Sequence, residues 1–486
     1  MRPYAPYDAE DFRSIGHSFV DRLADYLARC SQALPGDPNS PPVLALREPK
    51  ELEALWAANF EDGPAADKEQ RALEFVDSVL EACNHLHQPG YIGHQVSPSL
   101  PFATLLEMLS SLLNNGMAVW EMGQLQTVLE RRCVRWMADK IGFPKGAGGL
   151  MTSGGSLGNL TALLAARQAK TGSWAAGSVN SKPLAVLVSE DSHYCIARAM
   201  QIMGQGEQGV IRVPVDENHR MRTEHLEPLL RSAKDRGVQV FAVVSSSCST
   251  STGAFDDLVA IADFCERHAL WLHVDGAHGA SQLLSKQYRA PLEGIERADS
   301  VVWDAHKMML VPALSTGLIF REDRHAAETF AQEAAYLFED DMAAFDIGHR
   351  TLECTKRAMG LTLYACLHVY GEALFADYVD RAVGLAREFA GRLEASADFS
   401  LPLLPESNIV CFRFTPKGHE PSQLDALQED LRRKVIQAGR YYLVQTQLPE
   451  GTHLRVTLMN PATSIEDLDG LLTHLRELWQ VGHSPV

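Results

Sequence analysis

The middle third of the chain alternates short apolar segments with longer amphipathic segments, and this alternation is the strongest constraint on the fold. The short segments have the length of buried strands, and the longer ones have helical periodicity. The strand-like segments are 184–189, 210–215, 238–246, 270–275, 300–304 and 315–321, and the helix-like segments are 159–170, 193–203, 222–236 and 257–268. Such alternation predicts a buried, mainly parallel sheet that is covered by helices. Ligands of these sheets bind at the carboxyl ends of the strands.

Both ends of the chain differ from this middle part. Apolar residues near the N-terminus recur at helical spacing, namely Phe12, Ile15, Phe19, Leu23 and Leu27. They predict a helix that packs either on its own subunit or across a partner subunit. Near the C-terminus, 401–414 and 453–459 resemble strands and 465–479 resembles a closing helix. We therefore expect a helical segment (1–85), a large α/β domain (86–370) and a small C-terminal α+β domain (371–486).

Length and composition narrow the class of protein. The 486 residues are 46% hydrophobic and 22% charged, which is enough for one large core with smaller lobes. The formal net charge is −18 and no basic stripe is present, so we do not expect a nucleic acid partner. Neither a signal peptide nor a membrane-spanning segment is expected.

The nine cysteines are scattered without a Cys-x-x-Cys pair. This usage is typical of reduced thiols buried as small hydrophobic groups, and it predicts a cytoplasmic location. A zinc site at Cys195, Cys248 or Cys265 lacks the usual ligand spacing, so no metal is expected.

Two residues that follow predicted strands suggest a cofactor. Lys307 comes soon after segment 300–304, and Asp275 ends segment 270–275. A lysine amine can hold the aldehyde of pyridoxal phosphate (PLP) as a Schiff base, and a carboxylate keeps the pyridine nitrogen protonated so that the ring accepts electrons. Either residue alone also has an ordinary structural explanation.

A glycine-rich run, 152–160, leads directly into a helix, and the helix-like segment 159–170 begins within the run. Glycines allow the backbone to approach an anion, and a helix start presents unpaired N–H groups, so the run predicts a phosphate cradle. It lacks the lysine of a P-loop and the spacing of the dinucleotide fingerprint, which disfavours ATP and NAD. An ordinary glycine turn capped by a serine is the alternative.

His193 follows segment 184–189 at the start of another helix-like segment. An imidazole at this place can stack on a flat heteroaromatic ring. A histidine that caps the helix or belongs to the core is the alternative.

The identity and order of these motifs resemble those of the fold-type I, group II PLP-dependent amino acid decarboxylases. This family contains glutamate, cysteine sulfinate, aromatic amino acid and diaminobutyrate decarboxylases, and the resemblance covers roughly residues 75–475. It implies a PLP-dependent transferase-like fold with a seven-stranded, mainly parallel sheet. It also implies PLP as the cofactor, an amino acid substrate, and a homodimer with the active site at the subunit interface.

The resemblance implies roles for individual residues. Lys307 would bind the cofactor aldehyde, Asp275 would contact the pyridinium nitrogen, and His193 would be the base that stacks on the ring. The other implied cofactor contacts are Ala277, Gly155, Ser156, Thr250 and His306.

The resemblance also implies residues that act on the substrate. Segment 91–97 is similar to the substrate-facing strand of the family, so His94 and Gln95 are candidates for recognition of the substrate side chain. Tyr336 resembles the catalytic tyrosine that protonates the α-carbon, and the sequence around it is similar to that of the glutamate and cysteine sulfinate branch.

Three positions depart from the family pattern. Relatives usually carry Asn-Pro where this chain has Asp304-Ala305, and an aromatic residue where it has His278. A carboxylate beside a phosphate is repelled, so we expect Asp304 either to point away or to pair with a cation. No arginine clearly matches a clamp for a distal carboxylate, and Arg350 and Arg357 are the nearest candidates.

The leading hypothesis is a carboxy-lyase of the glutamate or cysteine sulfinate type that releases CO2 and a primary amine. Decarboxylation of diaminobutyrate or of an aromatic amino acid is an alternative. An aldehyde synthase is another, although relatives of that kind tend to have lost the tyrosine that matches Tyr336. A PLP aminotransferase and a catalytically inactive binding protein are the alternatives from other classes.

Overall fold

The fold is seen in a computed structural model that describes residues 8–35, 40–57, 67–172, 177, 182–332, 344–418 and 420–481. The chain divides into two compact units. The larger unit contains residues 95–390 and 403–410, and the smaller unit contains residues 1–94, 391–402 and 411–486.

The larger unit is built on a seven-stranded sheet with the order β1-β7-β6-β5-β4-β2-β3. The strands are β1 (Gly148–Thr152), β2 (Leu184–Ser189), β3 (Val210–Val213), β4 (Gln239–Ser246), β5 (Trp271–Asp275), β6 (Ser300–Asp304) and β7 (Thr316–Phe320). β7 is antiparallel to both of its neighbours, β1 and β6, while β6, β5, β4, β2 and β3 pair in parallel. The prediction of a mainly parallel α/β sheet is confirmed.

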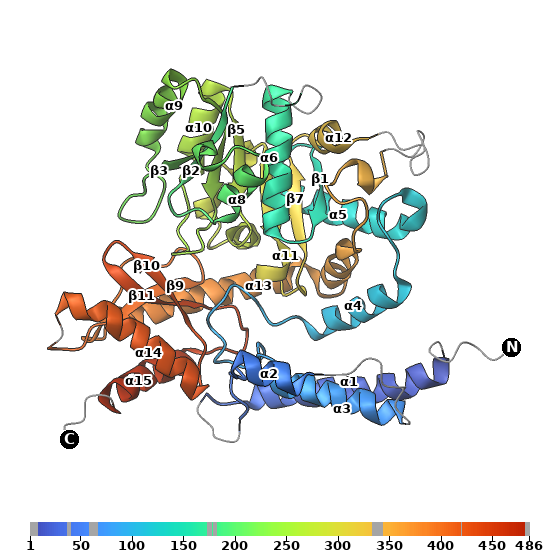
Figure 1. Cartoon of the computed structure of the whole chain (residues 1–486), viewed down its shortest axis with the longest axis vertical. Coiled ribbons are helices and arrows are strands. Elements are labelled where there is room, and N and C mark those ends of the chain that lie inside the picture. Colours follow the sequence, from blue (N-terminus) through green and yellow to red (C-terminus); the bar gives the residue numbers. More distant parts are fainter. Residues whose placement is uncertain are drawn as a thin grey trace. The chain divides into compact units, whose positions relative to one another are not determined.

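Helices cover both faces of this sheet, and Figure 1 shows α6 in front of the strands. The helices of the larger unit are α4 (Pro101–Leu113), α5 (Gln124–Ile141), α6 (Gly155–Thr171), α8 (Cys195–Ile202), α9 (Leu226–Asp235), α10 (Leu258–His268), α11 (Ala305–Met308) and α12 (Arg324–Phe330), together with most of α13 (Met359–Glu394). Successive strand residues point to opposite faces. On β4, for example, Val243 belongs to the core under α5 and α10, and Val244 belongs to the core under α6 and α8.

The strand directions place five chain segments at one edge of the sheet. Because β1, β2, β4, β5 and β6 all run the same way, their carboxyl ends meet there. The glycine-rich run, the segment before α8, the loop after β4, Asp275, and the turn of α11 that carries Lys307 all follow these ends.

The smaller unit contains a four-stranded sheet with the order β10-β11-β9-β8. Its strands are β8 (Phe399–Ser400), β9 (Ile409–Phe414), whose first two residues lie in the larger unit, β10 (Val444–Leu448) and β11 (Gly451–Thr457). Its helices are α1 (Ala9–Gln32), α2 (Pro49–Leu55), α3 (Lys68–Ala82), α14 (Leu424–Ala438) and α15 (Ile465–Val481).

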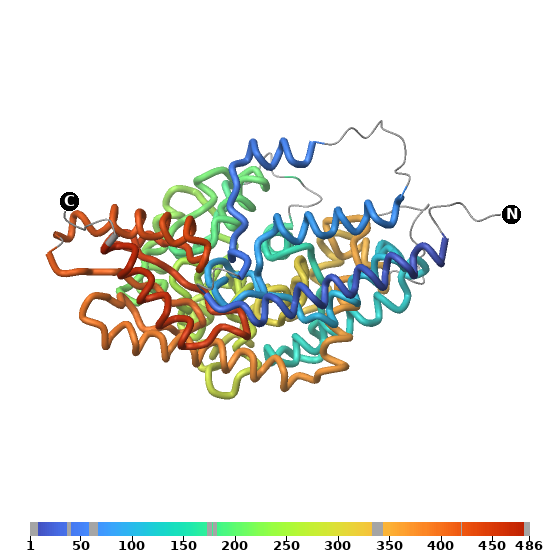
Figure 2. The backbone as a smooth tube through the Cα atoms, turned by 90° about the horizontal axis from the view of Figure 1, so that it is seen from below, coloured from blue at the N-terminus to red at the C-terminus, as the bar shows by residue number. Residues whose placement is uncertain are grey.

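Helices α1 and α3 run side by side (Figure 2). The Ser14 hydroxyl donates to Glu69, and the Arg22 guanidinium donates to Asp77. Both pairs are separated by 55 residues, so the two helices are parallel. The apolar face predicted for α1 is only half-buried, and Phe12 is exposed.

Several predicted boundaries were wrong. Residues 401–408 do not form a strand, because Pro402 and Pro405 remove backbone donors, and β9 begins only at Ile409. α6 begins at Gly155 instead of residue 159, so part of the glycine-rich run is already helical. The three-part division at residues 85 and 370 remains a prediction. Among the described residues, no helix is long and apolar enough to cross a membrane.

Candidate functional site

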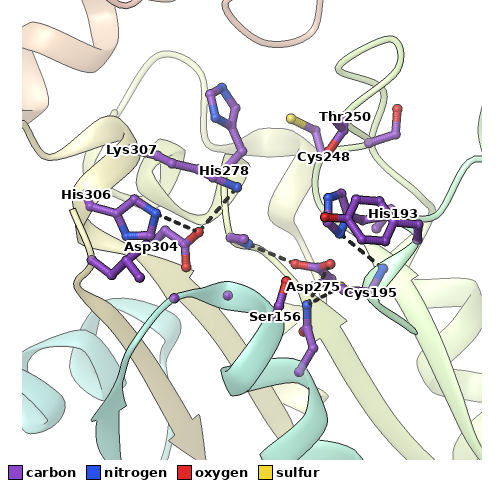
Figure 3. Close-up of a pocket in the computed structure, with 18 of the residues that line it drawn as sticks. Ser156, His193, Cys195, Cys248, Thr250, Asp275, His278, Asp304, His306 and Lys307 are labelled. Atoms are coloured by element: carbon purple, nitrogen blue, oxygen red, sulfur yellow. Dashed lines mark hydrogen bonds and ion pairs between the residues drawn. The ribbon is translucent and has the colours of Figure 1, made fainter. Parts of the chain in front are cut away.

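A cavity of about 410 Å³ lies at the carboxyl edge of the seven-stranded sheet, within the larger unit (Figure 3). In Figure 3, His306 and Lys307 lie on one side and His193 and Thr250 on the other, with Asp275 between them. The lining residues come from the segments after β1, β2, β4, β5 and β6 and are Ser153, Gly154, Gly155, Ser156, Asn159, His193, Tyr194, Cys195, Ser246, Cys248, Ser249, Thr250, Asp275, Ala277, His278, Asp304, His306, Lys307 and Leu314.

The glycine-rich run forms one wall of this cavity at the start of α6. Gly154 has a φ of 99°, a conformation that side chains disfavour, and it turns the chain from β1 into the helix. A Cβ at Gly155 would lie 3.1 Å from both carboxylate oxygens of Asp304 and 3.4 Å from the Ala277 Cβ. The backbone therefore approaches the cavity closely. A helix start also presents unpaired N–H groups, which favour an anion.

Asp275 ends β5 and is held by two donors. Its Oδ1 accepts a hydrogen bond from the Ala277 N–H (3.3 Å), and its Oδ2 accepts one from the Asn159 side-chain amide (3.0 Å). Burial raises the pKa of Asp275, while Lys307 and His193 act in the opposite direction. The carboxylate thus combines a desolvated position with donors that favour its charged form.

Lys307 lies on the single turn of α11 and pairs with Asp304. Its Nζ is 3.2 Å from Asp304 Oδ2, and His306 Nε2 is 3.6 Å from the same oxygen. Across the β6–β7 ladder, the Thr316 hydroxyl donates to Asp304 Oδ1 at 2.6 Å. The cation that pairs with Asp304 is therefore Lys307, with His306 nearby.

This pairing determines the protonation of the lysine. Burial alone would lower the pKa of Lys307, but the carboxylates of Asp304 and Asp275 outweigh it and raise the pKa above its ordinary value. Lys307 is consequently an ammonium group at neutral pH.

His193 is fixed in one tautomer by the backbone. Its Nδ1 accepts a hydrogen bond from the Cys195 N–H (3.3 Å), which leaves the proton of the neutral ring on Nε2. Burial and the charge of Lys307 lower the pKa of His193, and they outweigh the carboxylates of Asp275 and Asp304, which raise it. The imidazole is therefore neutral at neutral pH, and its ring lies against Tyr194 with centroids 4.3 Å apart.

The predicted cofactor residues are brought together in this single cavity. Its lining includes all eight of them, namely Lys307, Asp275, His193, Ala277, Gly155, Ser156, Thr250 and His306. The cavity thus joins predicted cofactor residues that are up to 152 positions apart along the chain.

The substrate candidates do not line the cavity. Gln95 belongs to the larger unit, where its side-chain nitrogen is buried without a hydrogen-bond partner. Two residues later, the Ser97 hydroxyl donates to the His306 carbonyl (3.5 Å). His94 belongs to the smaller unit, and its pKa is lowered by partial burial and by Arg455 and Arg432. Tyr336 lies outside the described residues.

Sequence reasoning missed Asn159, which donates to Asp275 from the first turns of α6. An available signal was its place in the helix start beside the cradle. The two arginines that the sequence suggested are engaged elsewhere, since Arg350 pairs with Asp323 and Arg357 with Glu107. Neither of them lines the cavity.

The donor set fits PLP. A buried lysine, a desolvated carboxylate and a helix start are the three groups that an aldehyde, a pyridine nitrogen and a phosphate require. All three converge on a volume suited to a small cofactor.

Comparisons with known proteins lead to the same family. Residues 49–415 match the model of the pyridoxal-dependent decarboxylase conserved domain. The human cysteine sulfinic acid decarboxylase is 30% identical over 452 residues, which cover 90% of this chain and 91% of the relative. The aromatic-L-amino-acid decarboxylase of Bacillus atrophaeus is 27% identical and covers 97% of this chain and 96% of the relative.

A solved structure agrees with the fold as well. The crystal structure of mouse CSAD in apo form is 27% identical, covers 97% of this chain and 99% of that chain, and has a TM-score of 0.89. The family match extends over about three quarters of the sequence. The chain therefore belongs to the family of pyridoxal-dependent decarboxylases and is a carboxy-lyase that uses PLP.

Proposed function

We propose that PLP binds in the cavity at the carboxyl edge of the large sheet. Lys307 would hold the aldehyde, Asp275 the pyridine nitrogen, and the start of α6 at Gly155 and Ser156 the phosphate together with His306. His193 and Ala277 would flank the ring, and Thr250 would lie beside it. The convergence of the lysine, the carboxylate and the helix start on one cavity carries this proposal.

The reaction would be α-decarboxylation of an L-amino acid. The bound cofactor supplies an electron sink for the pair that remains on the α-carbon when CO2 leaves. His193, which is neutral and carries its proton on Nε2, would stack on the ring and hold it in place. Tyr336 would return one proton to the α-carbon, so that the products are CO2 and a primary amine.

We further propose a substrate with a second acidic group, as in the glutamate and cysteine sulfinate branch. The segment around Tyr336 resembles that branch in sequence. Arg455 and Arg432 both lower the pKa of His94 and so place positive charge near this substrate candidate. Such charge agrees with an anionic side chain on the substrate.

Other branches of the family remain alternatives to this substrate. A diaminobutyrate decarboxylase of Acinetobacter baumannii is 27% identical over 88% of this chain, and the aromatic decarboxylase matches equally well. Identity of this order does not select one side chain over another.

We also propose that the protein acts as a cytoplasmic homodimer with its active site at the subunit interface. The α4 helix supports the dimer, because it leaves a row of large apolar side chains exposed, namely Leu105, Met108, Leu109, Leu112 and Leu113. Such a face is typical of a surface that a second copy covers. All nine cysteines lie among the described residues and are free thiols, in agreement with a reducing compartment.

The test is CO2 release by the PLP-loaded protein across a panel of L-amino acids, with mass identification of each product. We expect release with glutamate, aspartate or cysteine sulfinate, together with the matching amine. Release with diaminobutyrate or aromatic amino acids alone would refute the acidic substrate. The Lys307→Ala variant should lose the absorbance of the Schiff base between the lysine and PLP, and an unchanged spectrum would refute the lysine assignment.

A further inference from the structure

A chain of four buried hydrogen-bonding side chains ends at Asp275. The Asn159 amide nitrogen lies 3.0 Å from Asp275 Oδ2, and its amide oxygen lies 2.8 Å from His273 Nε2. His273 Nδ1 is 2.8 Å from the Ser300 hydroxyl, which is also 2.8 Å from the Trp271 indole nitrogen. The last three side chains belong to the neighbouring strands β5 and β6, whose register pairs His273 with Ser300.

The direction of every hydrogen bond in this chain is determined by chemistry. Asn159 must turn its NH2 group toward Asp275, because its oxygen would otherwise face a carboxylate. Its oxygen can only accept, so His273 carries its proton on Nε2. His273 Nδ1 is then an acceptor for the Ser300 hydroxyl, which itself accepts from the Trp271 N–H. All donors therefore point toward Asp275.

These four hydrogen-bonded side chains carry no charge. Burial lowers the pKa of His273 to about 4, so the ring is neutral at neutral pH. Asn159, His273 and Ser300 are each at most 1% exposed, so their hydrogen bonds are shielded from bulk solvent. The charged and titratable groups around Asp275 are Lys307, His193, Asp304 and the Cys195 thiol, and the last also lies 3.2 Å from the Asn159 amide nitrogen.

We propose that Asn159 and His273 are positioning residues that keep Asp275 ionised and directed at the ring nitrogen of the cofactor. This inference rests on the proposed role of Asp275 as the partner of that nitrogen. Ser300 acts at the far end by fixing the tautomer of His273, so the whole chain strengthens one hydrogen bond between the protein and PLP.

A purely structural role predicts something different. If these hydrogen bonds only satisfied buried polar groups, their loss would weaken the fold around the cavity. The binding of any ligand with the shape of PLP would then be reduced. The proposed role affects only ligands that carry a ring nitrogen. A PLP analogue with carbon in place of that nitrogen distinguishes the two roles.

The experiment measures the dissociation constants of PLP and of the carbon analogue by absorbance titration of the full-length apoprotein. In the wild type we expect the analogue to bind about 10- to 100-fold more weakly, as befits the loss of a hydrogen bond to a charged group. In Asn159→Ala this ratio should fall about tenfold, chiefly because PLP binds less tightly. His273→Ala should lower the ratio about two- to fivefold, and His273→Gln, which keeps a donor near the Nε2 position, should restore it.

A matched control is Asn408→Ala. Asn408 is 1% exposed, and its side chain hydrogen-bonds His278 beside the cavity and the Met308 sulfur. This variant should change both dissociation constants by the same factor, so the ratio should stay at the wild-type value. Ser300→Ala, a milder change than the loss of Asn159, should lower the ratio in the same sense as His273→Ala.

Two outcomes separate failure of this inference from failure of the proposed function. A normal wild-type ratio that Asp275→Asn abolishes, but that Asn159→Ala and His273→Ala leave unchanged, would overturn the positioning role alone. A wild-type protein that binds PLP and the analogue equally would show that Asp275 does not contact the ring nitrogen, and both proposals would fall.

Discussion

Asp304→Asn should accelerate the capture of PLP by the apoprotein. Lys307 must be a neutral amine to attack the cofactor aldehyde, and the Asp304 carboxylate raises its pKa. At 3.2 Å and an effective dielectric constant of about 20, the Coulomb attraction between Lys307 and Asp304 is about 5 kcal/mol. Loss of even about 1.4 kcal/mol of this energy raises the fraction of neutral amine tenfold, so we expect capture at neutral pH to be at least about tenfold faster.

The variant should retain the fold, because asparagine keeps an oxygen that accepts from the Thr316 hydroxyl. Its new NH2 group can donate to the lone pair of a neutral Lys307 amine, whereas it would face the protons of an ammonium group unfavourably. The substitution therefore changes the protonation of the lysine with little change of shape.

The assay is stopped-flow absorbance after apoprotein and PLP are mixed, repeated from neutral to alkaline pH. A raised pKa keeps the ammonium form to higher pH, so the wild-type rate should rise with pH, and this rise should move to lower pH in the variant. Asp299→Asn is the matched control at the other end of β6, where Asp299 accepts from the Leu272 N–H, and its profile should follow the wild type.

The shape of the pH profile determines whether the reasoning holds. If Asp304 only repelled the phosphate, the variant would be faster by one factor at every pH. An unshifted profile, whether faster or not, would refute the claim that Asp304 holds the proton on Lys307.

Three further predictions concern other parts of the protein. Gly155→Ala should weaken PLP binding about tenfold in an equilibrium titration, because the new Cβ would press on Asp304. Gly146→Ala, which has open space around it, should bind PLP normally. Equal affinities of the two variants would refute the phosphate cradle. Tyr336→Phe should shift the product from amine to aldehyde, with uptake of O2 and water and release of CO2, ammonia and hydrogen peroxide, and mass analysis that found only amine would remove Tyr336 as the proton donor. Lys356→Met should lower the free energy of unfolding in urea by about 3–5 kcal/mol, because it leaves Glu130 as an unpaired buried charge. Arg357→Ala, which breaks an exposed ion pair, should lower this free energy by at most about 1 kcal/mol.

The central strands were predictable because their signal is local. Strands buried on both faces are nearly continuous apolar runs, and β2, which spans Leu184–Ser189, was predicted residue for residue. β1 was missed because it begins with Gly148 and Gly149, which are poor strand formers, and pairs only with β7 at the edge of the sheet.

The candidate site was predictable where a single residue type carries the chemistry. Lys307, Asp275 and His193 stand out because few other side chains do the work proposed for them. The contacts of Asn159 were not predictable, since they depend on how α6 lies against β5. A partial signal existed in His273, a polar residue in an apolar strand two positions before Asp275 and hence on the same face.

The departure at Asp304 changes the electrostatics of the cavity. With His193 neutral, the cavity holds two carboxylates, Asp275 and Asp304, against the single ammonium of Lys307. An anionic cofactor would be repelled by these two carboxylates. The start of α6 offsets part of this repulsion through its free N–H groups. The Thr316 hydroxyl and the Lys307 ammonium, which both contact Asp304, disperse the charge of that carboxylate. A family member with asparagine at this position lacks that opposition, so this chain should release PLP more readily than its Asp304→Asn variant does.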